Sequence, residues 1–206
     1  LPRMPTNFSP KNPENPYVDY TEQDVYAFLK SYELPRDVGA TYEYSNLGVG
    51  LLGIALSRRD GRPYESMVKA RVLDPLGMAD TRVALDASTR ERLVLGHDVA
   101  GKVVSNWDIT GLGAAGALRS TMTDMLKYLA ANIDTARGPL GRVLATTHTK
   151  RHDTTSPTMN IGLAWHILSA RTGNTVTWHN GGTGGYRTFI GFDAARRVGA
   201  VVLTNS

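Results

Sequence analysis

Apolar side chains recur at helical spacing through the first two thirds of the chain. Val25, Phe28 and Leu29 share one face of a predicted helix, which begins at the capping residue Thr21 and ends before Pro35. The same spacing and capping signals predict further helices over 45–59, from 64 to the turn at 74–78, and over 120–132, where Ser120 is the expected cap.

The last forty residues change to short segments rich in β-branched and aromatic side chains. Turn-forming residues separate these segments at 171–174, 181–185 and 193–199, which predicts a meander of antiparallel strands. The expected strands cover 163–170, 175–179, 188–192 and 200–204. Helices first and strands last predict an α+β fold, with a mainly helical region over 1–160 and antiparallel strands over 161–206.

The sequence also predicts that this fold is incomplete at both ends. The chain begins at Leu1 with neither an initiator Met nor a charged-then-apolar leader, and residues 1–20, rich in Pro and Asn, are expected to be irregular and extended. It stops at Ser206, directly after a predicted strand. A sheet built only from these strands would leave one edge and one face uncovered.

Composition narrows the class of protein. The chain has 206 residues, of which 41% are hydrophobic and 20% charged, as in an ordinary globular domain. No stretch approaches the roughly 18 consecutive apolar residues of a membrane helix, so we expect no transmembrane segment. The net charge of +4 comes mostly from arginine without a basic stripe or interleaved aromatics, so nucleic-acid binding is not expected. The absence of cysteine excludes disulfides, zinc–thiolate sites and a thiol nucleophile.

Tyr44 and Asn46 form the first candidate for chemistry. They lie two residues apart just before a predicted helix, so both side chains can face a cleft. A phenol is a poor base unless nearby cations lower its pKa, so a catalytic tyrosine needs a lysine or histidine beside it. Asn46 offers a donor and an acceptor, which can orient an amide. Taken alone, a tyrosine beside a helix start is more often a core residue.

The second candidate is the glycine-rich segment 178–186 around His179. Its glycines let a ligand lie close to the strand, where backbone N–H groups can face a developing oxyanion. His179 would place a polar or partly cationic ring beside that position. Taken alone, such a run is more often only a tight turn.

The order of several motifs resembles that of the serine β-lactamase and penicillin-binding protein family, in the branch of class C β-lactamases, D-amino acid peptidases and related esterases. The resemblance covers essentially the whole chain. The matching segments are Tyr44-Ser45-Asn46-Leu47-Gly48, Leu51-Leu52-Gly53, Asp74-Pro75-Leu76-Gly77-Met78, Ala115-Gly116-Ala117-Leu118-Arg119-Ser120-Thr121 with Asp124, Gly162-Leu163-Ala164-Trp165, His179-Asn180-Gly181-Gly182-Thr183-Gly184-Gly185 and Val201-Val202-Leu203-Thr204-Asn205.

This resemblance implies a penicillin-recognising fold and a serine hydrolase that forms an acyl-enzyme from an ester, amide or β-lactam. Tyr44 would transfer protons together with the lysine of a Ser-x-x-Lys motif, and Asn46 would orient the substrate. His179 stands where the family has the lysine of Lys-Thr-Gly, and the N–H of Gly182 would donate to the oxyanion. The implied substrate-binding residues are Asn180, Gly181 and Thr183.

Two departures from the family pattern matter. Ser-x-x-Lys precedes Tyr-x-Asn in the family, but no such motif precedes Tyr44 here. The one literal match, Ser66 to Lys69, follows Tyr44 inside a predicted helix, and we interpret Ser66 as helix surface. A histidine at position 179 is only partly charged near neutrality, which weakens the case for β-lactam hydrolysis and leaves esterase or peptidase activity.

Two alternatives to this enzyme stay open. A non-catalytic member of the fold would use the same cleft to bind peptidoglycan-like peptides. A metal hydrolase would use His148 and His152, whose spacing suits one helix face. Their surroundings look like exposed loop, so we expect no metal, and His97 and His166 are interpreted as isolated structural residues.

The expected partners are a small-molecule or peptide substrate and the Ser-x-x-Lys segment of the same protein. We expect no cofactor. Export to the periplasm or outside the cell is expected because the family is usually found there.

Overall fold

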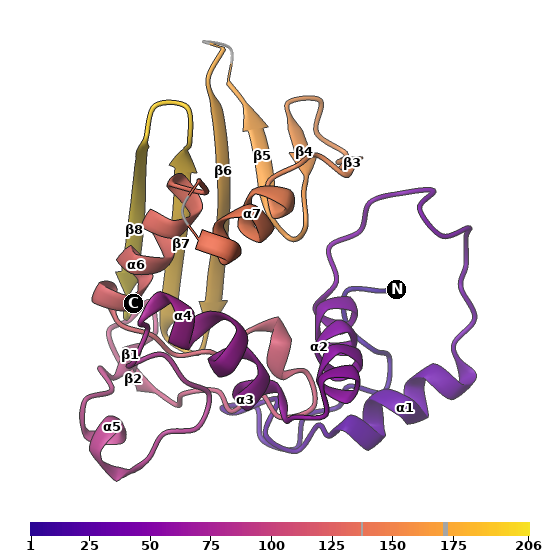
Figure 1. Ribbon diagram of the computed structural model, residues 1–206. Coiled ribbons are helices and arrows are strands. Elements are labelled where there is room, and N and C mark those ends of the chain that lie inside the picture. Colours follow the sequence, from indigo (N-terminus) through magenta and orange to yellow (C-terminus); the bar gives the residue numbers. More distant parts are fainter. Residues whose placement is uncertain (137, 171–172) are drawn as a thin grey trace.

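The computed structural model describes residues 1–136, 138–170 and 173–206, which form a helical part and an antiparallel sheet (Figure 1). The helical elements are α1 (Glu22–Ser31), α2 (Asn46–Asp60), α3 (Tyr64–Val68), the π-helical η1 (Lys69–Leu73), α4 (Asp74–Leu76), α5 (Ala87–Glu91), the 3-10 helix η2 (Gly113–Ala115), α6 (Met122–Ile133) and α7 (Gly138–Thr147). The strands are β1 (Gly96–His97), β2 (Val103–Val104), β3 (His152–Asp153), β4 (Met159–Ile161), β5 (His166–Ser169), β6 (Thr175–Thr183), β7 (Tyr186–Asp193) and β8 (Val198–Thr204).

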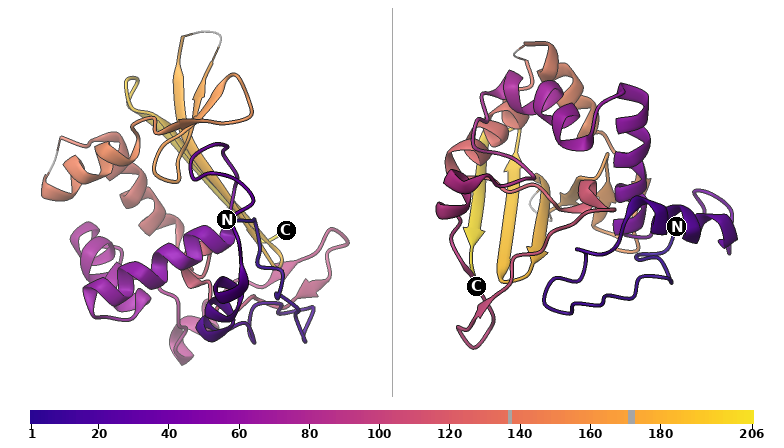
Figure 2. Two further views of the ribbon diagram at one scale, coloured as in Figure 1. Left: turned by 90° about the vertical axis from the view of Figure 1, so that its right-hand side faces the viewer. Right: turned by 90° about the horizontal axis from the view of Figure 1, so that it is seen from below.

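The main sheet has six strands in the order β3-β4-β5-β6-β7-β8, and every neighbouring pair is antiparallel. Helices α6 and α7 lie against one of its faces, while α1 to α3 gather toward the end of the sheet where β6 ends (Figures 1 and 2). The predicted meander is therefore confirmed. Strands β3 and β4 also join it, although the sequence did not predict them, and the division of the chain at residue 160 stays a prediction.

The predicted turn over 181–185 is wrong in its extent. Strand β6 continues through Thr183 and pairs with β7, so the turn itself consists of Gly184 and Gly185. Glycine has low strand propensity, which is why the run Gly181-Gly182 read as a turn. The predicted turn over 171–174 includes residues 171 and 172, which lie outside the described residues.

Capping side chains set the helix starts. Thr21 forms a capping box with Asp24 at the start of α1, as predicted. Ser45 caps α2, which ends at Gly61 in the left-handed conformation (φ 76°). Helix α6 is capped by Thr121 rather than by Ser120, because the Ser120 hydroxyl instead shares a hydrogen bond of 2.7 Å with that of Thr81.

One core cluster joins the N-terminal segment to α1 and α2. Its buried members are Tyr20, Val25, Phe28, Leu47 and Leu112. Residues 1–20 are irregular, as predicted, but they form turns and bends that pack on this cluster, so the predicted extended course is wrong. A second cluster, made of Leu129, Trp165, Ile190 and Phe192, packs α6 on the sheet.

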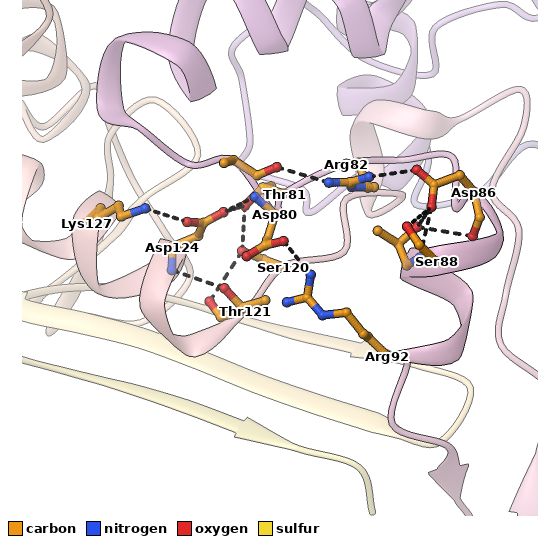
Figure 3. Close-up of polar contacts among 12 residues, drawn as sticks. Asp80, Thr81, Arg82, Asp86, Ser88, Arg92, Ser120, Thr121, Asp124 and Lys127 are labelled. Carbon is orange, nitrogen blue, oxygen red and sulfur yellow. Dashed lines mark hydrogen bonds and ion pairs between the residues drawn. The ribbon is translucent and has the colours of Figure 1, made fainter.

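A buried carboxylate links α6 to the segment after α4 (Figure 3). Asp124, whose relative exposure is 1%, accepts hydrogen bonds from the Asp80 backbone N–H (2.8 Å) and the Thr81 hydroxyl (2.9 Å). Lys127 donates to its other oxygen at 2.9 Å. These bonds hold α6, which packs on the sheet, against the segment that follows α4. No helix in the described parts of the chain is long and apolar enough to cross a membrane.

Candidate active site

Tyr44 precedes α2, and the neighbouring residue Ser45 fixes the chain at this point. The Ser45 hydroxyl donates to the Pro2 carbonyl (2.6 Å) and accepts from the Gly48 N–H (2.8 Å). Both hydrogen bonds are structural, so Ser45 is engaged as the helix cap. Tyr44 itself remains 39% exposed, which leaves its ring accessible beside the start of the helix.

The N-terminal segment brings a cation to Tyr44. The Arg3 carbonyl accepts from the N–H groups of Asn46 (3.0 Å) and Leu47 (3.3 Å), the first residues of α2. The Arg3 guanidinium carbon then lies 5.1 Å from the centroid of the Tyr44 ring, within the range of a cation–π contact. A lysine or histidine was the expected neighbour of Tyr44, and this arginine was not predicted.

Asn46 is the first residue of α2, and its side chain faces the N-terminal segment. Its Nδ2 lies 3.7 Å from the Met4 sulfur, which also accepts from the Tyr17 hydroxyl at 3.9 Å. Burial raises the pKa of Tyr17, and a hydrogen bond with Asn46 partly offsets this rise. The half-buried Asn46 amide is therefore engaged by Met4 and Tyr17, and its role in orienting a substrate stays a prediction.

Strand β6 brings the second predicted segment to the first. The rings of Tyr44 and His179 are nearly parallel, with centroids 6.3 Å apart and an interplanar angle of 28°. His179 is half-buried, and burial lowers its pKa, while a hydrogen bond with the Asn180 backbone partly offsets this effect. A lowered pKa means that His179 is mainly neutral at pH 7.

The glycines that follow His179 differ in how closely other residues pack against them. A Cβ at Gly184 would lie 2.5 Å from the Ser105 carbonyl oxygen, and one at Gly185 would lie 2.5 Å from the carbonyl carbon of Gly96, so these residues let the hairpin tip pack closely. A Cβ at Gly182 would make only ordinary contact, 3.5 Å from the Arg187 side chain. Asn180 and Gly182 are exposed on β6, with Gly181 and Thr183 half-buried beside them, and the binding roles of all four stay predictions.

Comparisons with known proteins bear on this arrangement. A sequence model described as Beta-lactamase matches residues 2–206. The chain belongs to the beta-lactamase family. It is 26% identical over 199 residues to D-alanyl-D-alanine-carboxypeptidase/endopeptidase AmpH of Escherichia coli, covering 90% of this chain and 51% of that protein. It is 24% identical to a beta-lactamase of Pseudomonas fluorescens, covering 79% and 54% of the two chains.

Solved structures of beta-lactamase relatives show the same fold. A class C beta-lactamase superposes with a TM-score of 0.80 and 25% identity, covering 92% of this chain and 59% of that one. The beta-lactamase/D-alanine carboxypeptidase of Pseudomonas syringae also gives 0.80, at 20% identity, covering 89% and 60%. The fold is therefore the penicillin-recognising one, as the sequence predicted. The chain spans about half the length of the curated relatives it matches.

The one Ser-x-x-Lys match of this beta-lactamase family chain lies on its surface. Ser66 is exposed on α3, and Lys69, at the start of η1, is exposed and paired with Asp74. This placement agrees with the interpretation of Ser66 as helix surface.

The metal hypothesis for His148 and His152 is wrong in its geometry. His148 follows α7 and bonds to Asn132 through Nε2 (2.8 Å), whereas His152 lies in β3 and bonds to the Gly39 carbonyl (3.0 Å). The two residues therefore share no helix face. Within the described ranges, no group of three or more His, Cys, Asp or Glu residues is placed to hold a metal ion.

The interpretation of His166 as isolated is also wrong. Its ring stacks on that of His179, with centroids 5.4 Å apart and an interplanar angle of 17°. The register of β5 and β6 places His166 opposite Trp178, the residue before His179, and neither segment alone reveals this pairing. His97, by contrast, donates its backbone N–H to the Asn205 carbonyl (2.8 Å), as expected of a structural residue.

Proposed function

We propose that this chain forms most of the active site of a serine hydrolase that cleaves an ester or amide through an acyl-enzyme. The observation that carries the proposal is the parallel contact of Tyr44 and His179, residues far apart in sequence that the β6 strand brings together. Membership of the beta-lactamase family supports a serine-dependent mechanism.

In this mechanism Tyr44 exchanges a proton with the nucleophilic serine and the leaving group. The guanidinium of Arg3 lies over the face of the Tyr44 ring, and His179 can accept or donate a hydrogen bond at the substrate. The N–H of Gly182 donates to the oxyanion, and Asn46, Asn180, Gly181 and Thr183 orient the acyl group.

The nucleophile is proposed to lie in sequence outside this chain. Two observations support this: the only Ser-x-x-Lys match is exposed on α3, and the chain spans about half of its relatives. The Ser-x-x-Lys segment of the same protein would dock beside Tyr44, and the whole protein would act in the periplasm or outside the cell.

The neutral state of His179 decides among substrate classes. A permanent cation would suit a substrate carboxylate such as that of a β-lactam, whereas a mainly neutral imidazole suits uncharged groups. One relative is named a D-alanyl-D-alanine-carboxypeptidase/endopeptidase, and the endopeptidase part of that name supports internal peptide bonds, which carry no terminal carboxylate, beside esters as candidate substrates.

Intact mass spectrometry after treatment with a fluorophosphonate tests the proposal. The measurement uses this chain and the protein extended upstream to include a Ser-x-x-Lys motif, each with Ser66→Ala as a matched control. We expect one adduct on the extended protein, retained in Ser66→Ala, and none on this chain. An adduct at Ser45 or Ser66, or no adduct on either protein, would overturn the proposal; the second result would favour the binding member of the fold.

A further inference from the structure

His166 is the first residue of β5, and its ring lies between two aromatic neighbours of β6. Its centroid is 4.8 Å from the Trp178 ring at 31° and 5.4 Å from the His179 ring at 17°. The register of the two strands fixes this position, because His166 pairs directly with Trp178. The ring therefore forms the wall of the candidate site on the side of the sheet.

The polar atoms of His166 favour its neutral form. Its Nδ1 is buried without a hydrogen-bond partner. Protonation would place an N–H donor there with no acceptor, and a buried unpaired donor loses the hydrogen bond it made with water. Burial lowers the pKa of His166, and a positive charge on His179 lowers it further, so a charge on one ring disfavours a charge on the other.

Two titratable rings face His179, and one permanent cation lies beyond one of them. His166 approaches from β5, Tyr44 approaches from the start of α2, and Arg3 holds a permanent positive charge 5.1 Å from the Tyr44 ring. On β7 the residue opposite His179 is the apolar Ile190. None of these groups is a carboxylate, so nothing among them stabilises an imidazolium at position 179.

We propose that His166 is a positioning residue whose ring shields His179 from water and holds it neutral, so that the site takes acyl groups without a carboxylate near neutral pH and accepts carboxylates only in acid. The substrate class rests on the proposed function, but the shielding does not. The ring of His166 acts here by exclusion of water, since its own neutral form contributes no charge.

Proton NMR titration of the histidine ring signals in this chain tests the shielding. In the unmodified chain, His179 should titrate below the ordinary histidine value of about 6.5. His166→Phe keeps an aromatic wall and should leave that midpoint low, whereas His166→Ala admits water and should raise it. Conversely, His179→Phe should raise the midpoint of His166, because the neighbouring charge is removed. His152→Phe, at an exposed histidine of β3, is the matched control and should change neither.

Several results would overturn the proposal. The first is a His179 midpoint at or above 6.5 in the unmodified chain, which needs no variant and so is informative even if His166→Ala fails to fold. The second is an equal rise in His166→Phe and His166→Ala, and the third is no rise in a folded His166→Ala.

The substrate class is tested with two small probes that differ by one charge. Affinity for N-acetylglycinate, followed through the His179 signal, should fall about tenfold for each pH unit above the His179 midpoint. Affinity for the neutral N-acetylglycinamide should stay constant over the same range. A carboxylate affinity independent of pH would overturn the proposal. Neither titration requires a nucleophile, so failure to form an acyl-enzyme would reject the proposed function while leaving the shielding by His166 intact.

Discussion

Replacing Asp124 with alanine should destabilise the fold strongly. The carboxylate is 1% exposed and accepts three hydrogen bonds, from the Asp80 N–H, the Thr81 hydroxyl and the Lys127 ammonium, at 2.8, 2.9 and 2.9 Å. Alanine leaves the first two donors without their acceptor in a buried site and removes the partner of a cation. Lys127 is partly exposed and can turn to water, so the loss comes mainly from the other two donors. A hydrogen bond to a charged group contributes about 1.5–3 kcal/mol, so the two together imply a loss of about 3–6 kcal/mol.

Thermal unfolding followed by circular dichroism measures this loss. For a chain of 150–250 residues, 1 kcal/mol corresponds to about 2–4 °C, so Asp124→Ala should lower the Tm by about 6–24 °C. Asp153→Ala, which removes an exposed partner of Lys150, is the matched control and should change stability by about 1 kcal/mol or less. If Asp124→Ala lowers the free energy of unfolding by less than about 1 kcal/mol, this network does not hold α6 to the segment after α4.

Three further predictions concern the hairpin and the histidines. Gly184→Ala should lower the free energy of unfolding, measured by chemical denaturation, by about 1–3 kcal/mol, because its Cβ would lie 2.5 Å from a backbone oxygen and 2.6 Å from the Trp107 indole nitrogen. Gly182→Ala, whose Cβ meets only ordinary contacts, should be tolerated. Equal losses of stability in the two variants would contradict the close packing of the hairpin tip. Burial lowers the pKa of His148 in the folded chain, so its contribution to stability is complete above the unfolded value of about 6.5 and declines as the pH falls below it. The free energy of unfolding should therefore decrease from pH 7.5 to 5, and less steeply in His148→Gln. The same pH dependence in His148→Gln as in the unmodified chain would exclude this residue as the cause. His179→Lys should make binding of N-acetylglycinate independent of pH between 6 and 8 in isothermal calorimetry, and a persistent pH dependence would show that another group sets the charge of the site.

Local signals in the sequence were sufficient to predict α1, α2 and α6, but they did not predict α7. The capping box of Thr21 and Asp24 and the cap at Ser45 act within one turn, so their residues alone determine where α1 and α2 begin. The start of α6 could not be placed to the residue, because Ser120 and Thr121 are equally good caps. A contact with Thr81, from a distant segment, engages Ser120 and leaves Thr121 to cap the helix.

The glycine-rich segment shows why strand ends were harder to predict. Gly181 and Gly182 have low strand propensity, but pairing with Thr188 and Arg187 on β7 overrides it. That pairing is a tertiary effect absent from any local window. The two-residue strand β3 carries no periodic signal at all, since only its pairing with β4 defines it.

The candidate site could be predicted as two segments but not as a set of contacts. The motif order identified Tyr44 and His179, and the structure places their rings 6.3 Å apart. Arg3 was missed because its role depends on the N-terminal segment folding back onto α2. His166 was missed because a lone histidine shows no pattern until the register of β5 and β6 is known.

The rate of serine acylation in the upstream-extended protein tests the central claim, that Tyr44 transfers protons in a serine hydrolase site shared with His179. Fluorophosphonate labelling would be followed over time by intact mass for the unmodified protein, Tyr44→Phe and the control Tyr26→Phe, in which a tyrosine of α1 outside the site is changed. Tyr44→Phe should slow acylation by about 10²–10⁴-fold, the usual contribution of a general acid–base group, while Tyr26→Phe should leave the acylation rate unchanged. Equal rates in all three proteins would contradict it.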